Sequence, residues 1–557
     1  MGTGLARDLA LRGLECVVVE KKRLNAGASG ANHGLLHSGA RYVSNDPLTA
    51  RECCSESRLL KQLAPHCCEA PGGLFVAVAG DDETYVADFP RLCAENGISA
   101  RAVDRGEARE IEPELSEDLI AAYRVEDACV DPFRLSFDNM ADAAAHGARL
   151  LTRSRVVGMS RLGKQIHSVR VHRQTTGEEI EIEAEQVVNA GGAWVGEVAE
   201  LAGLDLPVVW SKGSMLICRM RVTERVINRL RPPADGDIVV PGGTVSLVGT
   251  TSVRVSDIEH LRTGFNEVDF LVEEASKMVP AIQDTRLLRA FAGVRPLICR
   301  PNVLDDRTIS RSMQIIDHEA DGVANLVTVL GGKLTTFRLA AEKAADVVCR
   351  RMGVNARCLT KELPLPDASV NDWVAAGMAP SLWMRQKKPN DALLCECEMV
   401  PVSAIAQIVE QLRADGETVD LDAIRLHSRM GKGSCQGTFC GLRTMEFLYE
   451  HGAYTGDQGI QDLKAFLESR WKGLRPVLWG SQLIQEQLQE AVHCGLFCLE
   501  TRMNTDGETR MDTDKDARMN MRHGWTRMGR HGWTRMKTHG WTRDTDEHGW
   551  EDTDEHG

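Results

Sequence analysis

Short apolar runs alternate with amphipathic stretches along residues 1–345 of this chain. An Ala/Leu/Arg-rich stretch begins after Met1 and ends at Gly13, and the apolar run that follows it finishes on Glu20. A helix that ends on a glycine and leads into a short apolar strand is typical of a βαβ unit. The segments GGLFVAVAG, QVVNAGGAWV, TVSLVGTTSV and NLVTVLGGKLTTFRLAAEKAADVVC repeat this alternation further along. The pattern predicts an α/β domain with insertions.

The first helix has features of a dinucleotide-binding site. A Gly-rich turn into a helix presents backbone N–H groups to a pyrophosphate, and an acid at the end of the second strand receives ribose hydroxyls. Gly2 and Glu20 occupy the last-glycine and acid positions of this scheme, although a glycine at a helix start also serves as a plain N-cap. The first strand and the first two glycines of a G-x-G-x-x-G loop do not appear. We therefore expect either a start site further upstream or, for a chain that begins at Met1, weakened dinucleotide binding.

The pattern changes character in the second half of the chain. A Pro-bearing stretch with little periodicity predicts a linker over 346–390, a compact cysteine-bearing module is expected at 391–452, and helical sequence continues over 453–500. Residues 501–557 repeat His-Gly-Trp with a short period among Asp, Thr and Arg. Such a repeat predicts disorder rather than a stacked repeat fold.

Composition narrows the class of protein. The chain has 80 acidic and 66 basic residues and a net charge of −14, which disfavours nucleic acid and anionic membrane surfaces as partners. No apolar run approaches the roughly eighteen residues of a membrane span, and no signal-peptide pattern opens the chain. The 17 cysteines are odd in number and often adjacent, unlike a secreted disulfide framework. We expect a cytoplasmic protein that reaches the inner face of the cell membrane only through partners.

A Gly-rich loop with two histidines follows the first nucleotide-binding elements. In GASGANHGLLHSGARY, residues 27–42, the glycines allow the backbone to pass close to a flat ligand. His33, His37, Arg41 and Tyr42 supply hydrogen-bonding groups at short intervals. Each histidine alone is more often a satisfied structural residue. Together, in this position, they indicate an isoalloxazine ring that lies over the loop.

Four cysteines further along form two close pairs. Cys395 and Cys397 give C-x-C, and Cys435 and Cys440 give C-x4-C in a Gly-rich segment. Four thiolates from two tight loops can hold a [2Fe–2S] cluster. Zinc is the competing metal, but structural zinc sites more often use C-x2-C spacing. The spacing therefore favours the cluster and leaves zinc as the alternative.

A series of motifs gives the chain a family resemblance: ARDLALRGL, NHGLLHSGARY, DPFRL, VVNAGGAW, GTT, GVRPL, GGKLTTFRLAAE, CEC, CQGTFC and RWKG, in this order. Over about residues 1–500 the sequence resembles the catalytic A subunits of anaerobic, FAD-dependent glycerol-3-phosphate dehydrogenase. The cysteine module resembles a bacterioferritin-associated ferredoxin-like domain. The resemblance implies an α/β, two-domain, FAD-binding Rossmann-like fold of the glutathione-reductase or D-amino-acid-oxidase type, here without its first strand. A substrate-binding subdomain is expected at roughly 75–150 and 200–300.

The resemblance implies oxidation of sn-glycerol 3-phosphate to dihydroxyacetone phosphate by hydride transfer to FAD. A flavin accepts two electrons together, whereas an iron–sulfur cluster passes one at a time, so the module would convert a hydride into single electrons. Companion B and C subunits, the latter an iron–sulfur membrane anchor, would carry the electrons to a membrane quinone in anaerobic respiration. Two alternatives stay open: a dehydrogenase or oxidase of a hydroxy or amino acid, and a truncated electron-transfer or assembly subunit without catalysis.

The implied substrate carries a phosphate dianion, which a planar guanidinium and a nearby ammonium can neutralise. We expect Arg295, fixed by the proline after it, and Lys333, which follows two glycines at a helix start, to hold this phosphate. The resemblance makes Arg41 and Tyr42 further substrate contacts.

The expected catalytic set is His37, Arg295 and Lys333, with His37 either as the base or as a residue that only orients the flavin. Related aerobic enzymes carry a histidine just after the KGS motif, where this chain has Met215. Thr335 and Thr336 are expected to cap the following helix and also to donate to flavin oxygens. FAD contacts are expected at Gly2, Glu20, Gly30, His33, Gly34, Val157, Gly191, Gly331, Gly332, Thr335 and Thr336.

Overall fold

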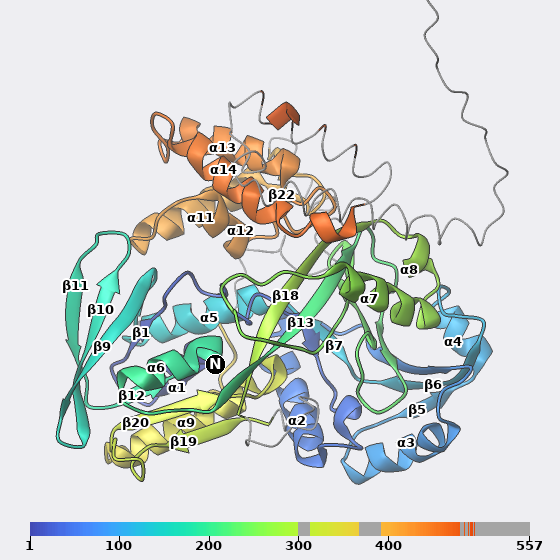
Figure 1. Ribbon diagram of the computed structural model, residues 1–557, viewed down its shortest axis with the longest axis horizontal. Helices are drawn as coiled ribbons and strands as arrows, with labels where there is room; N and C mark the ends of the chain where they lie inside the picture. Colours follow the sequence, from blue (N-terminus) through green and yellow to red (C-terminus); the bar gives the residue numbers. More distant parts are fainter. Residues whose placement is uncertain are drawn as a thin grey trace, which may run out of the picture. The chain divides into compact units, whose positions relative to one another are not determined.

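The structure is a computed structural model that describes residues 1–298, 312–366 and 391–478, with isolated positions between 484 and 495. Two compact units divide the chain after Val477. All helices and strands with described bounds lie in the first unit (Figure 1). Most of the predicted linker and the whole predicted tail, 501–557, lie outside the described residues. None of the described helices is long and apolar enough to cross a bilayer.

Two small parallel strand pairs form the first α/β layer. β1 (Val17–Val19) pairs with β8 (Arg149–Leu151), and β12 (Val187–Asn189) pairs with β20 (Leu326–Leu330). The antiparallel β19 (Gln314–Asp317) lies on the other side of β20. The apolar runs that predicted these strands are the segments that form them.

β1 and β12 each keep one unpaired edge among the described strands, because β1 pairs only with β8 and β12 only with β20. Both strands border the same large cavity. Val17, Val18 and Val19 remain partly exposed, whereas every residue of β20 is buried. The paired strands and the helices around them agree with the predicted Rossmann-like layer.

Helix α1 (Gly2–Leu11) packs between α5 (Pro132–Ala145) and α9 (Phe337–Arg351). Its leucines, Leu5 and Leu9, share a hydrophobic cluster with the alanines of α9, and its alanines share one with α5. Helix α9 continues through the predicted domain boundary at residue 345 and ends at Arg351. The residues after it also pack on this layer, since Arg7 donates to the carbonyls of Leu363 and Pro364.

A nine-stranded sheet forms the second layer. Its order is β17-β13-β16-β15-β14-β4-β6-β5, and β18 pairs antiparallel with β13 along almost its whole length. It draws its strands from residues 73–125 and 208–298, whereas α5 and β8, inside the predicted 75–150 span, belong to the first layer. The strands are β4 (Gly73–Val78), β5 (Arg101–Val103), β6 (Leu119–Val125), β13 (Val208–Cys218), β14 (Val226–Arg229), β15 (Ile238–Gly242), β16 (Val245–Gly249), β17 (Val253–Val255) and β18 (Leu287–Ile298).

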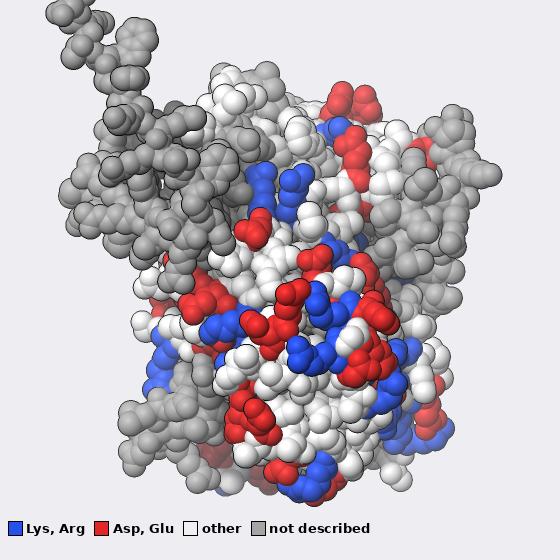
Figure 2. Space-filling view, turned by 90° about the vertical axis from the view of Figure 1, so that its right-hand side faces the viewer, with Lys and Arg blue, Asp and Glu red and all other residues white. Residues whose placement is uncertain are grey.

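The remaining elements before residue 367 flank these layers. One set is an antiparallel meander of β9 (Ser154–Leu162), β10 (Gln165–Arg173) and β11 (Glu179–Glu183), and another is a small sheet of β2 (Leu35–Leu36), β7 (Ala128–Val130) and β3 (Cys68–Glu69). The flanking helices are α2 (Pro47–Leu63), α3 (Glu83–Glu95), α4 (Arg105–Ile111), α6 (Val195–Leu201), α7 (Phe265–Met278) and α8 (Ala281–Asp284). Figure 2 shows acidic and basic side chains interspersed over the described part of one face.

The cysteine-bearing segment folds into a small helical module. Two short strands, β21 (Leu393–Cys395) and β22 (Val400–Pro401), precede α11 (Val402–Ala414), α12 (Leu421–His427), α13 (Thr438–Glu450) and α14 (Gln458–Trp471). Phe466 of α14 packs so closely against Gly437 and Gly441 that a Cβ on Gly437 would lie 2.6 Å from its ring. The module therefore includes α14, beyond the predicted boundary at residue 452.

Candidate functional site

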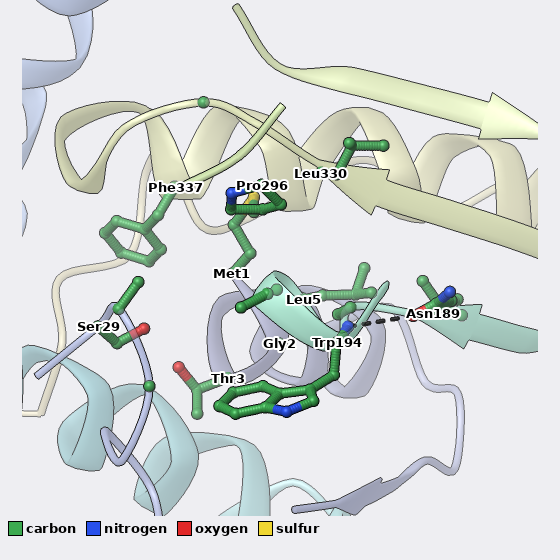
Figure 3. A pocket seen from close by; sticks show the side chains of 18 of the residues that line it. Met1, Gly2, Thr3, Leu5, Ser29, Asn189, Trp194, Pro296, Leu330 and Phe337 are labelled. Atoms are coloured by element: carbon green, nitrogen blue, oxygen red, sulfur yellow. Dashed lines mark hydrogen bonds between the residues drawn. The ribbon is translucent and has the colours of Figure 1, made fainter. Parts of the chain in front are cut away.

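The two layers and their flanking elements, all before residue 367, form what we call the large domain. A cavity of about 2040 Å³ opens between its two layers. Figure 3 shows the start of α1, Met1 to Thr3, beside Trp194, Pro296 and Leu330 on the cavity lining. Small-molecule sites in proteins measure roughly 300–1,000 Å³. The cavity therefore has room for a ligand of dinucleotide size together with a small substrate.

The end of the cavity beside β1 has the features expected for a dinucleotide. The backbone at Gly2 faces open space, since a Cβ built there meets only Ala190 at 3.9 Å. The carboxylate of Glu20, at the end of β1, accepts a hydrogen bond from the Lys22 N–H at 2.9 Å, and burial raises the pKa of Glu20. A helix start and an acid thus face the same space from neighbouring elements, as the sequence predicts for FAD.

Seven of the predicted FAD contacts line the cavity, and four do not. The seven are Gly2, Glu20, His33, Val157, Gly191, Gly331 and Gly332. Gly30 and Gly34 instead permit close packing of the loop, because a Cβ on Gly30 would lie 2.1 Å from the Asn25 carbonyl oxygen. Gly34 has φ +68° and would place a Cβ 2.8 Å from the Val130 carbonyl oxygen.

The two threonines support the residues around them. Thr335 is fully buried, and its Oγ1 accepts a hydrogen bond from the His37 N–H at 3.1 Å. Thr336 Oγ1 accepts from the Lys333 N–H at 3.2 Å. The predicted cap is confirmed for Thr336 at the 3-10 turn Leu334–Thr336, which leads directly into α9, because its hydroxyl accepts from the N–H of Lys333, the N-cap of that turn. Thr336 makes no side-chain cap hydrogen bond for α9 itself.

Two histidines and a tyrosine form a compact group on the cavity wall. Tyr42 OH and His37 Nε2 lie 3.3 Å apart, and the rings of His33 and His37 meet edge-on with centroids 6.1 Å apart. Burial, together with the charges of Arg295 and Arg41, lowers the pKa of His33 to about 3. Burial and the neighbouring charges likewise lower the pKa of His37 well below its usual value. Both imidazoles are therefore neutral at physiological pH, and His37 can accept a proton.

Three cationic side chains from distant segments line this part of the cavity. Arg295 on β18 donates from Nη2 to Thr250 Oγ1 at 2.9 Å and from Nη1 to the Thr251 carbonyl at 3.3 Å. Its guanidinium lies over Gly213, where a Cβ would approach Nη2 to 2.3 Å. A side chain at position 213 would therefore displace the guanidinium.

The other two cations approach the cavity from the N-terminal loop and from the start of α9. Arg41 Nη2 donates to Asp237 and to the Ala234 carbonyl, both at 3.0 Å, while its buried Nη1 has no hydrogen-bond partner among the described residues. Lys333 Nζ lies 4.2 Å from the centre of the Tyr42 ring. The structure thus brings together all of the predicted catalytic and substrate-binding residues.

A supporting network behind Arg295 was not predicted from the sequence. The carboxylate of Glu267 on α7 accepts from Ser214 and Thr251 at 2.8 Å each and from Lys212 at 2.7 Å. It fixes the segment to which Arg295 donates. The KGS and GTT motifs hold three members of this network, but no local signal marks Glu267, which comes from a separate helix.

Trp194 lines the cavity near β1, and Glu259 is its hydrogen-bond partner. Trp194 Nε1 donates to Glu259 at 2.7 Å, and Lys21 pairs with the same carboxylate at 2.7 Å. These contacts, the Lys21 hydrogen bond foremost, lower the pKa of Glu259 to about 2. No local pattern signals this pairing, because Glu259 lies in a loop of the second layer.

The four predicted metal-binding cysteines form a ring of sulfur atoms. The Sγ atoms of Cys395 and Cys397 lie 3.7 Å apart, as do those of Cys397 and Cys435. Hydrogen bonds from Cys397 and Cys440 lower the pKa of Cys395 and that of Cys435. Sulfur atoms this close suit thiolates that share metal, with metal–sulfur bonds of about 2.3 Å. We call these four residues the cysteine cage.

The loop around the cysteine cage is closely packed. A Cβ on Gly433 would lie 2.7 Å from Cys397 Sγ, so only glycine fits beside this sulfur. Glu398 is buried and binds the Arg429 guanidinium, which also donates to the Gly242 carbonyl of the nine-stranded sheet at 3.1 Å. The residues present therefore fit a tetrathiolate metal centre held against the large domain.

A second group of potential ligands lies elsewhere among the described residues. His66, Cys67 and Asp138 place their ligand atoms within 4.8 Å of one another. His66 Nε2 and Asp138 lie at 2.7 Å, and Arg134 lies 3.6 Å from the same carboxylate. A cation that close opposes a metal ion, so we interpret the group as a brace between the segment at residue 66 and α5.

Comparisons with known proteins agree with this geometry. The family model described as FAD dependent oxidoreductase matches residues 1–347. The chain is 42% identical over 520 residues to the A subunit of the anaerobic glycerol-3-phosphate dehydrogenase of Escherichia coli, covering 90% of this chain and 95% of that protein.

Solved structures share the fold at low sequence identity. The glycerol-3-phosphate dehydrogenase of Bacillus halodurans, complexed with FAD, gives a TM-score of 0.59 at 18% identity and covers 86% of this chain and 94% of that chain. The glycine oxidase of Geobacillus kaustophilus gives 0.53 at 22% identity and covers 63% and 92%. The predicted D-amino-acid-oxidase type of fold is confirmed, and proteins with different substrates share it.

Proposed function

We propose, from the premise that this chain belongs to the FAD dependent oxidoreductase family and to its anaerobic glycerol-3-phosphate dehydrogenase A subunits, that it oxidises sn-glycerol 3-phosphate to dihydroxyacetone phosphate. One observation carries the proposal. Arg41, Arg295 and Lys333 line the same cavity as the neutral His37. That combination suits a substrate with a dianionic phosphate and an alcohol to be deprotonated.

The cations would hold the phosphate. Arg41 contributes a buried Nη1 that no described residue engages, Arg295 a planar guanidinium fixed by two threonines, and Lys333 a point charge. A guanidinium fork pairs with two phosphate oxygens at once. A carboxylate also suits an arginine, so the number of cations, rather than one arginine, favours a phosphate.

His37 would take the proton of the substrate hydroxyl. Its backbone is fixed by Thr335, and its Nε2 faces Tyr42 OH. When bound, FAD supplies the hydride acceptor for oxidation of the C2 alcohol. Gly2 and Glu20 would hold the dinucleotide, with His33, Val157, Gly191, Gly331 and Gly332 along the rest of the cavity.

The cysteine cage would connect this reaction to other proteins. Cys395, Cys397, Cys435 and Cys440 would hold a [2Fe–2S] cluster, with zinc as the alternative, and a cluster supplies one-electron steps. Companion subunits would receive the electrons and pass them to a membrane quinone on the inner face of the cell membrane. The names of the relatives, which designate one lettered chain of a larger enzyme, support such partners.

Replacement of both Arg295 and Lys333 by alanine tests the phosphate site. We expect kcat/KM for glycerol 3-phosphate to fall at least about a hundredfold, since each lost charged hydrogen bond costs about 1.5–3 kcal/mol. The R124A/K164A variant is the matched control, because it removes the same two residue types from exposed positions. Flavin absorbance near 450 nm, measured in each variant, separates loss of substrate binding from loss of FAD.

Substrate comparison tests the alternative. Turnover of 2-hydroxyglutarate or proline faster than glycerol 3-phosphate would replace the proposal with a hydroxy- or amino-acid dehydrogenase. An unchanged kcat/KM in R295A/K333A with full flavin content would contradict the proposal that Arg295 and Lys333 bind the substrate phosphate. The same test can be made on a longer product that begins upstream of Met1, because neither the R295A/K333A variant nor its control changes the N-terminus.

A further inference from the structure

A buried arginine touches the loop that carries the cysteine cage. Arg470 on α14 is 6% exposed, and its Nη2 donates to the Gly431 carbonyl at 2.7 Å. Its Nε donates to the Gln436 carbonyl at 3.3 Å, and the Gln436 side chain accepts a further bond from Nη2. These acceptors flank Cys435 in the sequence. The guanidinium is thus fixed beside the cage by neutral groups.

No carboxylate among the described residues pairs with Arg470, and two other cations lie near it. Arg289 on β18 is half-buried, donates from Nη2 to the Ser469 carbonyl at 3.3 Å, and has an enclosed Nε that no described group accepts from. Arg425 is paired with Asp422 at 2.7 Å. Burial first, and then the charges of Arg289 and Arg425, lower the pKa of Arg470 well below its usual value.

An enclosed cation without a counter-charge is strongly unfavourable. Two negative groups favour the protonated guanidinium: Cys440 of the cage, and then Asp422, which already pairs with Arg425 at 2.7 Å. The loaded cage is therefore a source of the negative charge that Arg470 needs. Four thiolates around two irons and two sulfides carry a net negative charge. Uptake of one electron changes one ferric iron to ferrous and increases that negative charge by one.

We propose that Arg470 is the counter-charge of the loaded cysteine cage and, together with Arg289, raises its one-electron reduction potential. The inference rests on the proposed iron–sulfur cluster and adds the residues that set its potential. The two cations favour the reduced form because it is the more negative one. Arg470 also braces the cage loop, so hydrogen bonding and charge must be separated by experiment.

Two variants separate them. R470Q removes the charge and part of the brace, whereas R470K keeps the charge and loses the planar fork. R289Q removes a charge from a side chain that donates to Ser469 rather than to the cage loop, so its effect on the cage is electrostatic. R413Q is the matched control, because Arg413 is exposed on α11 of the same module.

The measurement is the midpoint potential of the cluster. The full chain is titrated with dithionite, and electron paramagnetic resonance monitors the reduced cluster at each potential. Iron and sulfide content are determined for each variant. We expect the ratio of reduced to oxidised cluster at a fixed potential to fall about tenfold in R470Q and in R289Q, a midpoint lower by about 59 mV. R470K and R413Q should stay close to the wild type.

The outcomes are distinct. An unchanged midpoint in R289Q and in loaded R470Q overturns the inference and leaves the proposed function intact. If R470Q does not take up the cluster, the midpoint potential of R289Q alone decides: an unchanged value overturns the inference. A wild-type chain that carries zinc and no acid-labile sulfide would instead contradict the proposed cluster, and the inference would fall with it.

Discussion

Single residues in the cavity take their chemistry from burial and from the cations around them. His33 and His37 are ordinary histidines in sequence, yet burial lowers the pKa of both. The charges of Arg295 and Arg41 add to this at His33, and those of Lys333 and Arg41 add to it at His37. A buried base next to two cations has a weak proton affinity until an anion enters. A phosphorylated substrate brings that anion, so binding itself would raise the basicity of His37.

The depressed pKa of His33 predicts a dependence of stability on pH. The folded pKa of about 3 lies below the usual 6.5, so the unfolded chain binds a proton first as the pH falls. The contribution of His33 is complete above pH 6.5 and is lost as the pH falls from 6.5 towards 3. Between pH 7 and pH 5 this amounts to about 2 kcal/mol of unfolding free energy.

We expect His33→Asn to remove that loss, because its amide oxygen can accept from the Leu35 N–H as His33 Nδ1 does. Urea unfolding at pH 7 and pH 5, with wild type and variant side by side, measures the difference. His167→Asn, at an exposed position on β10, serves as the control. Equal losses of stability in wild type and H33N would contradict the assignment.

At the scale of elements, the crossing of α1 and α9 depends on one small residue. Gly4 faces the ring of Phe337, and a Cβ there would lie 2.8 Å from two ring atoms. Both helices border the cavity, Gly2 at the start of α1 and Phe337 at the start of α9. Their separation therefore sets the width of the dinucleotide end.

Gly4→Ala should destabilise the protein by about 1–3 kcal/mol, because a well-packed crossing must open to admit the extra methyl. Gly196→Ala in α6 is the control, since a Cβ there meets only Val208 at an ordinary 3.8 Å. Urea denaturation of both variants gives the comparison. A G4A variant as stable as G196A would show that the crossing of α1 and α9 accommodates the added methyl group without strain.

At the scale of the whole molecule, the cysteine module and the large domain are joined as parts of one compact unit. Asp420, at the start of α12, accepts from Arg23 at 2.6 Å and from Arg153 at 2.7 Å, and also caps its helix through the Ala423 N–H. The ring of His427 stacks on Phe137 of α5 with centroids 3.7 Å apart. Such contacts hold the cysteine cage at a fixed place relative to the cavity.

Asp420→Asn keeps a helix-capping side chain and removes the charge that both arginines share. We expect the free energy that holds the module on the large domain to fall by about 1.5–3 kcal/mol, the range for hydrogen bonds to charged groups. Hydrogen exchange of α12 in the full chain should quicken accordingly. Asp415→Asn, exposed at the end of α11, should leave that exchange unchanged; faster exchange in both variants would point to the module itself rather than to its attachment.

The local residue pattern determined much of this protein. Apolar periodicity predicted α1, β1 and the α/β class, because it depends on residues near one another in sequence. The cysteines predicted the cage because the two members of each pair are close in sequence. The Gly-rich loop predicted His33, His37, Arg41 and Tyr42 as neighbours of one ligand. All four line the cavity.

Only the tertiary structure decided which distant residues act together. The nine-stranded sheet takes strands from either side of α5 and β8, and its pairing of β13 with β18 sets the Arg295 guanidinium over Gly213. Glu267, Glu259 and Arg470 acquire their roles through contacts across more than one element, and no local pattern encodes such contacts. The sequence thus determined what each segment becomes, whereas chain packing determined where each charge lies and which partner it meets.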